Sequence, residues 1–516
     1  MRKKRFLLNT LIITSTSFFL KVVGMFFRIY LSNAIGAEGM GLYQLIFSVY
    51  VLAISLSSAG VSVAVTRIIS EQTGPDGGRI SHQVILRSIF YVLLLSAIVS
   101  GGLFFCAEWV CRTFINDMRA VVPLKILCAA LPFIGCSACF KGYFTARDKV
   151  SKVSISQILE DLLKIILIVS LLGVFAGNGL VVACIIVMSA IALSEAASCA
   201  FLYASYRKDI GKNARPYERC GISVRLFTLI LTLAVGTIAG SGLHTAENML
   251  IPAGLLKFGM ARETALAKYG MLRGMTMPVL LFPSALLSAF STLLVPEITR
   301  AGVLNQKRTI NYTISRVFQI TLIPSIFIMG VFMVFSRQIG LAIYNNAEVG
   351  DMIRLLAPFI PFMYLDSSIF AILTGLDEQK SVLRITLVDS ILRVLFIYTL
   401  VPRYGFDGII FTMYLSNIIT PVVGTVKLIK KTGVSLNAVN WIVKPAAAVG
   451  FSAFAAIFFL NRFDVGGNAA QAVWGFLIMF FIYLLTLKAA AAYTHDDVVW
   501  LFSLFKQNKK RTKLPQ

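Results

Sequence analysis

Long apolar segments follow one another along almost the whole chain, from Phe6 to about Ala490. Each approaches the roughly 20 residues that an α-helix needs to cross a bilayer. Charged residues, Gly, Pro or Asn separate fourteen such segments, near residues 6–30, 41–66, 85–110, 121–140, 156–176, 180–204, 226–251, 270–295, 311–335, 352–373, 383–401, 405–426, 441–460 and 470–490. We therefore predict an all-α polytopic membrane protein with about fourteen transmembrane helices and no separate soluble domain.

Composition supports this class. Hydrophobic residues make up 57% of the chain and charged residues 14%, whereas soluble domains contain about 45–50% and about 25%. A soluble multi-domain enzyme is excluded. The basic start Met1–Arg5 resembles the beginning of a signal peptide, but its apolar run is too long, so we interpret it as an uncleaved first helix.

The net charge of +24, from 48 Lys and Arg against 24 Asp and Glu, first suggests nucleic acid as a partner. With the N-terminus inside, however, 31 basic residues fall in inner segments. Outer loops hold eight, namely Arg112, Arg119, Lys257, Arg262, Lys268, Arg337, Arg403 and Arg462. This asymmetry predicts a multi-pass protein of the cell membrane with both termini cytoplasmic, and no nucleic-acid partner.

Motifs for catalysis or metal binding are absent from the sequence. The eight cysteines have no nearby histidine, and Cys136 and Cys139 suit helix packing better than a metal site. No P-loop or G-x-S-x-G motif occurs. We therefore expect no enzyme, no metal and no cofactor, and energy from an ion gradient, the membrane potential or a partner.

An internal repeat is visible at a shift of 229 residues, where Thr145–Ile165 aligns with Thr374–Val394. Glu160 then meets Asp389, and Lys164 meets Arg393. Because the shift covers six helices, the two halves should share an orientation, as in transporters built from parallel repeats. The predicted organisation is a lobe over residues 1–210, a lobe over residues 220–432, two added helices over residues 440–490, and a cytoplasmic tail over residues 491–516. The two six-helix lobes should surround a central cavity.

Two acid–base pairs repeat within the predicted helices. Glu160 and Lys164 are four residues apart, as are Asp389 and Arg393, so each pair lies on one helical face. Each pair either neutralises itself near the inner interface or acts as a gate or substrate contact at the mouth of a cavity. Repetition in both halves favours the second interpretation.

Lys21, Arg28 and Arg273 lie in predicted helices without an acidic residue within a helical turn. A cation inside the bilayer needs water, an anion or snorkelling to the interface. Together they predict a cationic cavity for an anionic substrate, to which a diphosphate is well matched. Glu247 could bind a coupling ion or proton, or serve as a salt-bridge partner.

Several motifs resemble one transporter family. They are Lys21–Val–Val–Gly24, Gly36–Ala–Glu–Gly39–Met–Gly41–Leu–Tyr43–Gln–Leu45, Thr66–Arg67–Ile–Ile–Ser–Glu71, Ile155–Ser–Gln–Ile–Leu–Glu160 and Phe282–Pro283 with Leu294–Val–Pro296–Glu–Ile298. Over essentially its whole length the chain resembles the polysaccharide-exporter branch of the multidrug/oligosaccharidyl-lipid/polysaccharide (MOP) superfamily, which includes MurJ-type lipid II flippases.

The resemblance implies alternating-access export of an undecaprenyl-diphosphate-linked glycan precursor, with lipid II for sporulation or cell-wall peptidoglycan as the leading candidate. It places Lys21, Arg28 and Arg273 at cavity positions and Glu247 near a sodium-site carboxylate of some relatives. The bilayer and cell-wall synthesis proteins are the other implied partners.

Two alternatives remain. A MATE-like cation-coupled drug antiporter would favour negative charge in the cavity. A membrane glycosyltransferase or ligase acting on the same lipid would need a catalytic acid or His in a sizeable outer loop. The largest outer loop, Pro252–Tyr269, contains Glu263 as its only acid and no His.

Overall fold

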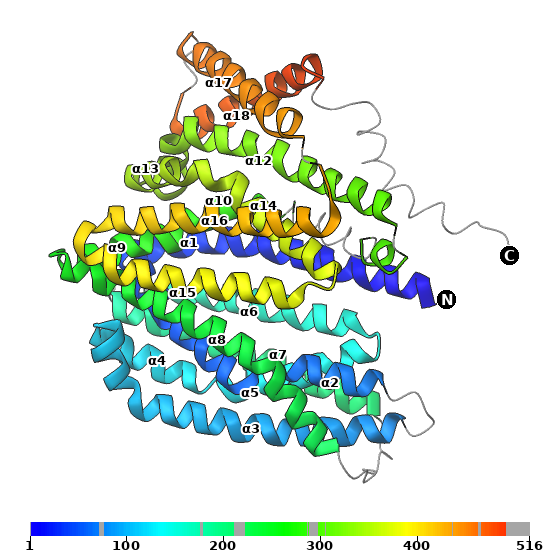
Figure 1. Ribbon diagram of the computed structural model, residues 1–516. Coiled ribbons are helices and arrows are strands. Elements are labelled where there is room, and N and C mark those ends of the chain that lie inside the picture. The colour runs from blue at the N-terminus through cyan, green and yellow to red at the C-terminus, as the bar shows by residue number, and fades with distance from the viewer. Residues whose placement is uncertain are drawn as a thin grey trace. The chain divides into compact units, whose positions relative to one another are not determined.

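The computed structural model describes residues 2–71, 77–175, 179–210, 222–285, 287, 298–304, 306–435, 437–462 and 466–491. Every regular element among them is a helix, so the predicted all-α class is confirmed (Figure 1). The longer helices are α1 (Arg2–Ser58), α2 (Val61–Ser70), α3 (Gly77–Val110), α4 (Val121–Cys128), α5 (Leu131–Ala146), α6 (Val150–Phe175), α7 (Leu180–Ile210), α8 (Ile222–Lys257), α9 (Arg262–Gly270), α12 (Lys307–Tyr344), α13 (Ala347–Leu356), α14 (Ile360–Gly375), α15 (Gln379–Tyr404), α16 (Phe406–Thr432), α17 (Lys444–Arg462) and α18 (Asn468–Ala489).

Ten of the described helices are long and apolar enough to cross a membrane, or eleven if the bent pair over 118–146 is one span. The predicted total of fourteen exceeds this for identifiable reasons. α1 joins two predicted spans without a loop, α6 carries Glu160, Asp161 and Lys164 in its apolar stretch, and the predicted span 270–295 runs beyond the described residues. Fourteen remains a prediction.

Contacts divide the chain into two compact units. Unit 1 contains residues 1–282 and 386–416, and unit 2 contains residues 283–385 and 417–516. The predicted lobes over residues 1–210 and 220–432 are a division by repeat rather than by contact, and they stay a prediction.

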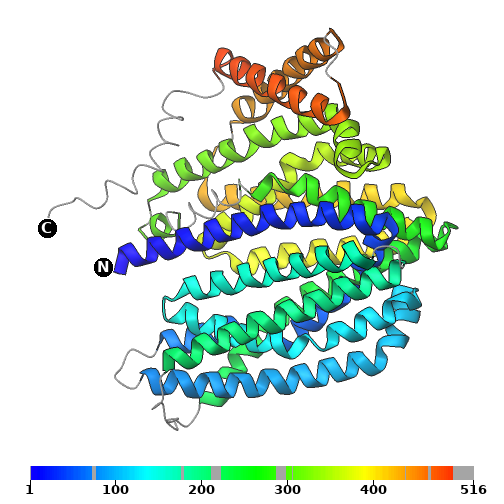
Figure 2. The same cartoon turned by 180° about the vertical axis from the view of Figure 1, so that it is seen from behind.

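Unit 1 has an apolar core built from α2, α3, α5, α7 and the start of α8. Val65, Ile68, Tyr143, Phe144 and Leu202 are almost completely buried there. α1 packs against α6, and α6 packs against α7; this row of helices is visible from behind in Figure 2. Such a core is stabilised by about 25 cal/mol for each Å² of apolar surface that it removes from water.

Unit 2 has two apolar clusters along α12. One, including Phe318, Ile369 and Trp441, joins α12 to α14 and the segment before α17. The other packs Phe327, Phe335 and neighbouring residues of α12 against α17 and α18. Tyr483 of α18 fixes this contact by donating a hydrogen bond to the Ile323 carbonyl at 2.8 Å.

The helix ends reproduce the predicted repeat. α5 and α14 begin and end 229 residues apart, at Leu131–Ala146 and Ile360–Gly375. α6 and α15 do the same, at Val150–Phe175 and Gln379–Tyr404. In both copies the turn between the helices places an aspartate in the left-handed region, Asp148 at φ 56° and Asp377 at φ 62°. Two helices and their connecting turn are therefore repeated residue by residue.

Candidate functional site

A kink at Gly36 divides α1 into two segments. Gly36 has φ 72° and ψ 178° inside a helix of 57 residues, a conformation essentially restricted to glycine. Before the kink, Lys21 and Arg28 are exposed. Among the described side chains neither takes part in an ion pair or hydrogen bond. The sequence prediction of two cations without acidic partners on α1 agrees with this placement.

Arg28 is not isolated electrostatically. It and Lys164 of α6 are both charged neighbours of the Tyr43 hydroxyl, beyond the kink. Since α1 packs against α6, basic groups from two helices act on one phenol. Lys164 is ion-paired with Asp161, so an anion near Tyr43 would interact mainly with the positive charge of Arg28.

A buried carboxylate, Glu247 of α8, lies at the centre of an ion cluster. Only 3% of its side chain is exposed. Arg273, in the π-helical segment η4 (Met271–Thr276), forms an ion pair with it. Nη2 of Arg393 on α15 lies 3.6 Å from the other carboxylate oxygen. Sequence analysis expected an unpaired Arg273, and this was wrong, because its partner lies 26 residues earlier in the chain.

The predicted pair Asp389–Arg393 forms and extends this cluster. Nε of Arg393 lies 3.3 Å from Oδ2 of Asp389, and the Ser416 hydroxyl donates to Oδ1 at 2.6 Å. Two guanidinium groups and two carboxylates therefore balance in charge. Burying them costs several kcal/mol per ion unless each is paired. The role of the pair as a gate and the role of Glu247 in ion coupling stay predictions.

The first copy of the repeat pairs its charges differently from the prediction. Lys164 forms an ion pair with Asp161, three residues earlier, instead of Glu160. Glu160 is approached by Lys141 of α5, whose Nζ lies 3.6 Å from Oε2. The spacing predicted the correct helical face but not the partner, since two acids stand side by side and a lysine from another helix competes.

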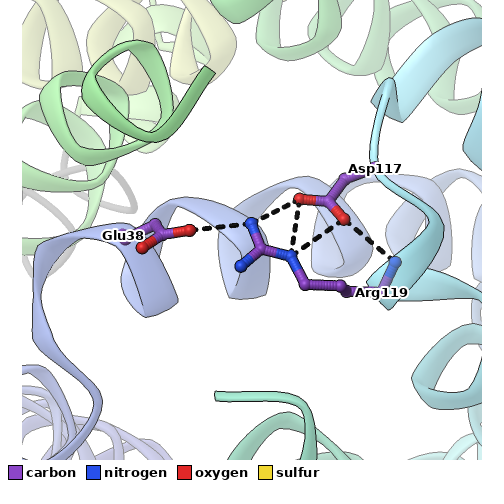
Figure 3. A network of polar contacts seen from close by, with 3 residues as sticks. All are labelled: Glu38, Asp117 and Arg119. Atoms are coloured by element: carbon purple, nitrogen blue, oxygen red, sulfur yellow. Dashed lines mark hydrogen bonds and ion pairs between the residues drawn. The ribbon is translucent and has the colours of Figure 1, made fainter. Parts of the chain in front are cut away.

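Sequence reasoning missed a third cluster, shown in Figure 3. Arg119 holds both oxygens of Asp117 through its Nε and also donates from Nη2 to Glu38 at 2.7 Å. Asp117 is 2% exposed. Although this burial raises its pKa, the hydrogen bonds from Arg119 outweigh it and lower the pKa overall. Glu38 follows the kink directly, so the cluster joins α1 to the segment before α4.

The same end of α1 packs closely on α9 and η4. A Cβ at Gly41 would collide with the Leu266 carbonyl, and one at Gly270 with the Ala37 carbonyl. A cavity of about 540 Å³ beside this contact is lined by Asp117, Met118, Arg119, Ala261, Arg262 and Glu263. The motif Gly39–Met–Gly41 was the only sequence signal for this backbone contact.

The described part of the chain contains no group of three or more His, Cys, Asp or Glu side chains placed to hold a metal ion. The seven cysteines that it includes are free, and all lie in unit 1. Helices, buried ion clusters and exposed cations on an apolar helix together define a multi-pass membrane transporter fold.

Comparison with known proteins agrees. The chain belongs to the polysaccharide biosynthesis protein family, whose model matches residues 6–302. Stage V sporulation protein B of Bacillus subtilis (strain 168) is 24% identical over 409 residues, covering 78% of this chain and 79% of that protein. Lipid II flippase MurJ of the same organism is 20% identical, covering 84% of each chain.

A solved structure of lipid II flippase MurJ in an inward closed conformation matches with a TM-score of 0.71 and 14% identity. The match covers 92% of this chain and 98% of that one. The predicted resemblance to the polysaccharide-exporter branch of the MOP superfamily, and within it to stage V sporulation protein B and MurJ, is confirmed.

Proposed function

We propose that the protein is a flippase that exports an undecaprenyl-diphosphate-linked glycan precursor, with lipid II for sporulation or cell-wall peptidoglycan as the first candidate. The glycan headgroup crosses the cell membrane through the protein while the prenyl tail stays in lipid. The same proposal places both termini in the cytoplasm. It assigns the protein a transport role with no bond-making chemistry.

Lys21 and Arg28 carry the proposal. Both are exposed on an apolar helix, and neither is ion-paired within the described residues. A diphosphate supplies the anion that such cations need inside a membrane. Arg matches phosphate oxygens through two hydrogen bonds, and Lys acts as a point charge.

Arg273 would contact the substrate in a different way from Lys21 and Arg28, because Glu247 already neutralises its charge. Its side chain is 16% exposed, so a phosphate can approach only by sharing or replacing that carboxylate. Glu247 keeps Arg393 as a second partner, which prevents it from becoming an unpaired buried charge. Arg273 can thus exchange partners as the substrate enters and leaves, and binding stays reversible.

The central experiment is reconstitution in liposomes with fluorescently labelled lipid II, with headgroup exposure followed by a membrane-impermeant quencher. Lys21→Ala and Arg28→Ala should each slow transfer about tenfold or more, since loss of a charged hydrogen bond costs about 1.5–3 kcal/mol. Lys488→Ala is the matched control, because Lys488 is an exposed cation at the end of α18 and should transfer lipid at the wild-type rate.

Three results would contradict the proposal. They are no transfer by the folded wild-type protein, equal rates in the Lys21 variant and the Lys488 control, and transfer of an organic cation in place of the lipid. The last would favour a MATE-like drug antiporter. Production of a new glycan bond in the liposomes would instead favour a glycosyltransferase or ligase.

A further inference from the structure

Basic residues from three segments of unit 1 gather where the end of α8, α9, and the turn between α15 and α16 meet. They are Lys257, Arg262, Lys268 and Arg403, which we call the basic junction. Nζ of Lys257 lies 5.7 Å from the centre of the Tyr398 ring on α15. Nζ of Lys268 lies 5.8 Å from the centre of the Phe406 ring on α16. Residues far apart in the chain therefore form one basic surface.

Buried packing holds the ends of α8 and α15 together at this junction. A Cβ at Gly254 of α8 would lie 2.8 Å from Cγ1 of Val401 on α15, and Val401 is completely buried. Lys257 and Arg403 follow this contact by three and two residues, and both are exposed. Their positions are thus fixed by two packed helices.

The positive charge of the junction is not neutralised by the protein. Among the residues that the structure describes, no carboxylate forms an ion pair with Lys257, Arg262 or Arg403. The segments 252–270 and 398–407 contain four basic residues and two acids, Glu263 and Asp407. Two positive charges therefore remain in excess, and they are available to an anion from outside the chain.

Basic residues are unexpected on this side of a membrane protein, because they usually collect in cytoplasmic loops. The outer location of the junction rests on the proposed function, which places both termini in the cytoplasm. Four of the eight outer basic residues lie at this one junction. The first copy of the repeat has Gly173–Val174–Phe175 where the second has Pro402–Arg403–Tyr404. The repeated scaffold itself therefore does not require the charge.

Large aromatic side chains are exposed around these cations. Tyr398, Tyr404 and Phe258 are each exposed to at least 45%. Aromatic residues with a polar group are enriched where a bilayer meets water, at the level of the lipid headgroups. Cations and aromatic residues together therefore indicate contact with headgroups rather than with the acyl chains.

Arg262 connects the junction to the cavity of about 540 Å³ described above, whose lining it shares with Arg119. Sites for small ligands have volumes of about 300–1,000 Å³. Arg119 is already held by Asp117 and Glu38. Arg262 is therefore the arginine of this lining whose guanidinium is available to an anionic group.

We propose that the basic junction binds the phosphate of a lipid headgroup in the outer leaflet. Arg262 and Arg403 supply guanidinium groups that match phosphate oxygens, and Lys257 supplies a point charge. Two lipids present this chemistry, namely the transported prenyl diphosphate after it has crossed and an anionic phospholipid of the membrane. The site is separate from Lys21 and Arg28, which precede the kink in α1.

Binding is tested by native mass spectrometry of the protein released from micelles with equal amounts of phosphatidylglycerol and phosphatidylcholine. The wild type should retain phosphatidylglycerol preferentially. Lys257→Ala and Arg403→Ala should each lower its retention about fivefold, since a basic residue near an anionic lipid surface contributes about 1 kcal/mol. Arg462→Ala is the matched control, because Arg462 is an exposed basic residue at the end of α17, and it should behave as the wild type. Equal retention by the junction variants and this control would overturn the proposal.

Labelled lipid II then identifies the occupant. Its retention is compared in Lys21→Ala/Arg28→Ala, which lacks the proposed transport cations, with and without Arg403→Ala. A loss on adding Arg403→Ala identifies the transported lipid, and a loss of phosphatidylglycerol alone identifies a membrane phospholipid. Loss of neither lipid rejects the site.

Failure of the site and failure of the proposed function give different results. Retention of phosphatidylglycerol that depends on Lys257 and Arg403, without lipid II transfer by the wild type in liposomes, rejects the function and leaves the phosphate site standing. Lipid II transfer with retention that ignores both residues does the reverse.

Discussion

The two copies of the repeat have matching helix ends, but their charged residues pair with different partners. α5 and α6 match α14 and α15 at every helix end, and the connecting turns share an aspartate in the left-handed region. In the second copy Arg393 binds Asp389 and also approaches Glu247. In the first copy Lys141 of α5 approaches Glu160, and Lys164 pairs with Asp161. The same scaffold therefore pairs its charges with α8 in the second copy and with α5 in the first.

The connecting turns show a second reversal. In the first copy basic Lys149 follows the turn and pairs with Asp209 near the end of α7. In the second copy acidic Glu378 occupies the equivalent place and pairs with Lys427 and Lys431 near the end of α16. Each turn thus forms an ion pair with the second helix after it, α7 or α16, and the signs of the two pairs are reversed. The position of the ion pair is common to both copies of the repeat. The charge of the residue in the turn is positive in one copy and negative in the other.

The largest difference in unfolding free energy is expected between Glu247→Gln and Glu160→Gln. Glu247→Gln leaves two guanidinium groups without their buried carboxylate and should cost about 3–5 kcal/mol of unfolding free energy. Glu160→Gln should cost less than about 1 kcal/mol, because its ion-pair partner Lys141 lies 3.6 Å away and is 25% exposed, so water can replace the pair. Thermal unfolding in detergent measures both.

A double variant is the control for the first value. Adding Arg273→Gln to Glu247→Gln should recover part of the loss, since fewer unpaired charges remain buried. Equal losses for the two single variants would show that the clusters do not differ in charge balance.

The ion pairs of Asp209 and of Glu378 should contribute differently to the free energy of unfolding. Tyr143 and Lys149 both donate to Asp209, whose side chain is 9% exposed. Asp209→Asn should cost about 1.5–3 kcal/mol, the typical value of a hydrogen bond to a charged group. Glu378→Gln should change the unfolding free energy much less, because water screens an exposed ion pair. A larger loss for Glu378→Gln than for Asp209→Asn would reverse this ranking.

Replacement of the turn aspartates should instead give equal effects. Val at Asp148 or Asp377 should cost about 1–2 kcal/mol more than Gly at the same position, since a side chain branched at Cβ is strained at positive φ. Gly and Val both lack the carboxylate, so their difference isolates the backbone. Unequal differences at the two positions would mean that the turns are not equivalent.

The smallest expected effect is on the pH dependence of stability, through the carboxyl group of Glu378. Hydrogen bonds from Lys431 and Ser381 lower the pKa of Glu378 from 4.5 to about 2. A carboxyl group whose pKa is lower in the folded than in the unfolded protein stabilises the fold at pH values above its pKa in the unfolded chain. This contribution is lost only as the pH falls from there towards about 2. The difference in melting temperature between wild type and Glu378→Gln should therefore be constant from neutral pH to about pH 5. A difference that disappears within this range would contradict the ion pairs at Glu378.

Much of the fold could be predicted because it depends on local properties. Apolar length located the helices, and the match of Glu160 and Lys164 with Asp389 and Arg393 located the repeat before its helix ends were known. The boundary at Gly36 was not predicted as a kink, since a glycine between two apolar runs suits a loop equally well.

The partners within the site could not be predicted, because they come from different helices. Arg273 meets Glu247 and Glu160 meets Lys141 only after η4, α8, α5 and α6 have packed. Spacing along one helix gave Asp389–Arg393 correctly and Glu160–Lys164 incorrectly. A local rule works where no competing charge is nearby and fails where Asp161 and Lys141 are present.

Gly36 divides α1 into two helical arms. The exposed cations Lys21 and Arg28 lie on one arm, and the other arm carries Glu38 and the close contact at Gly41. If the proposed function holds, the torsion angles of Gly36 set the angle between the segment that carries these cations and the segment that carries Glu38. A Cβ at Gly36 would meet nothing within 4 Å, so the positive φ of this residue, and not a lack of space, is what favours glycine there.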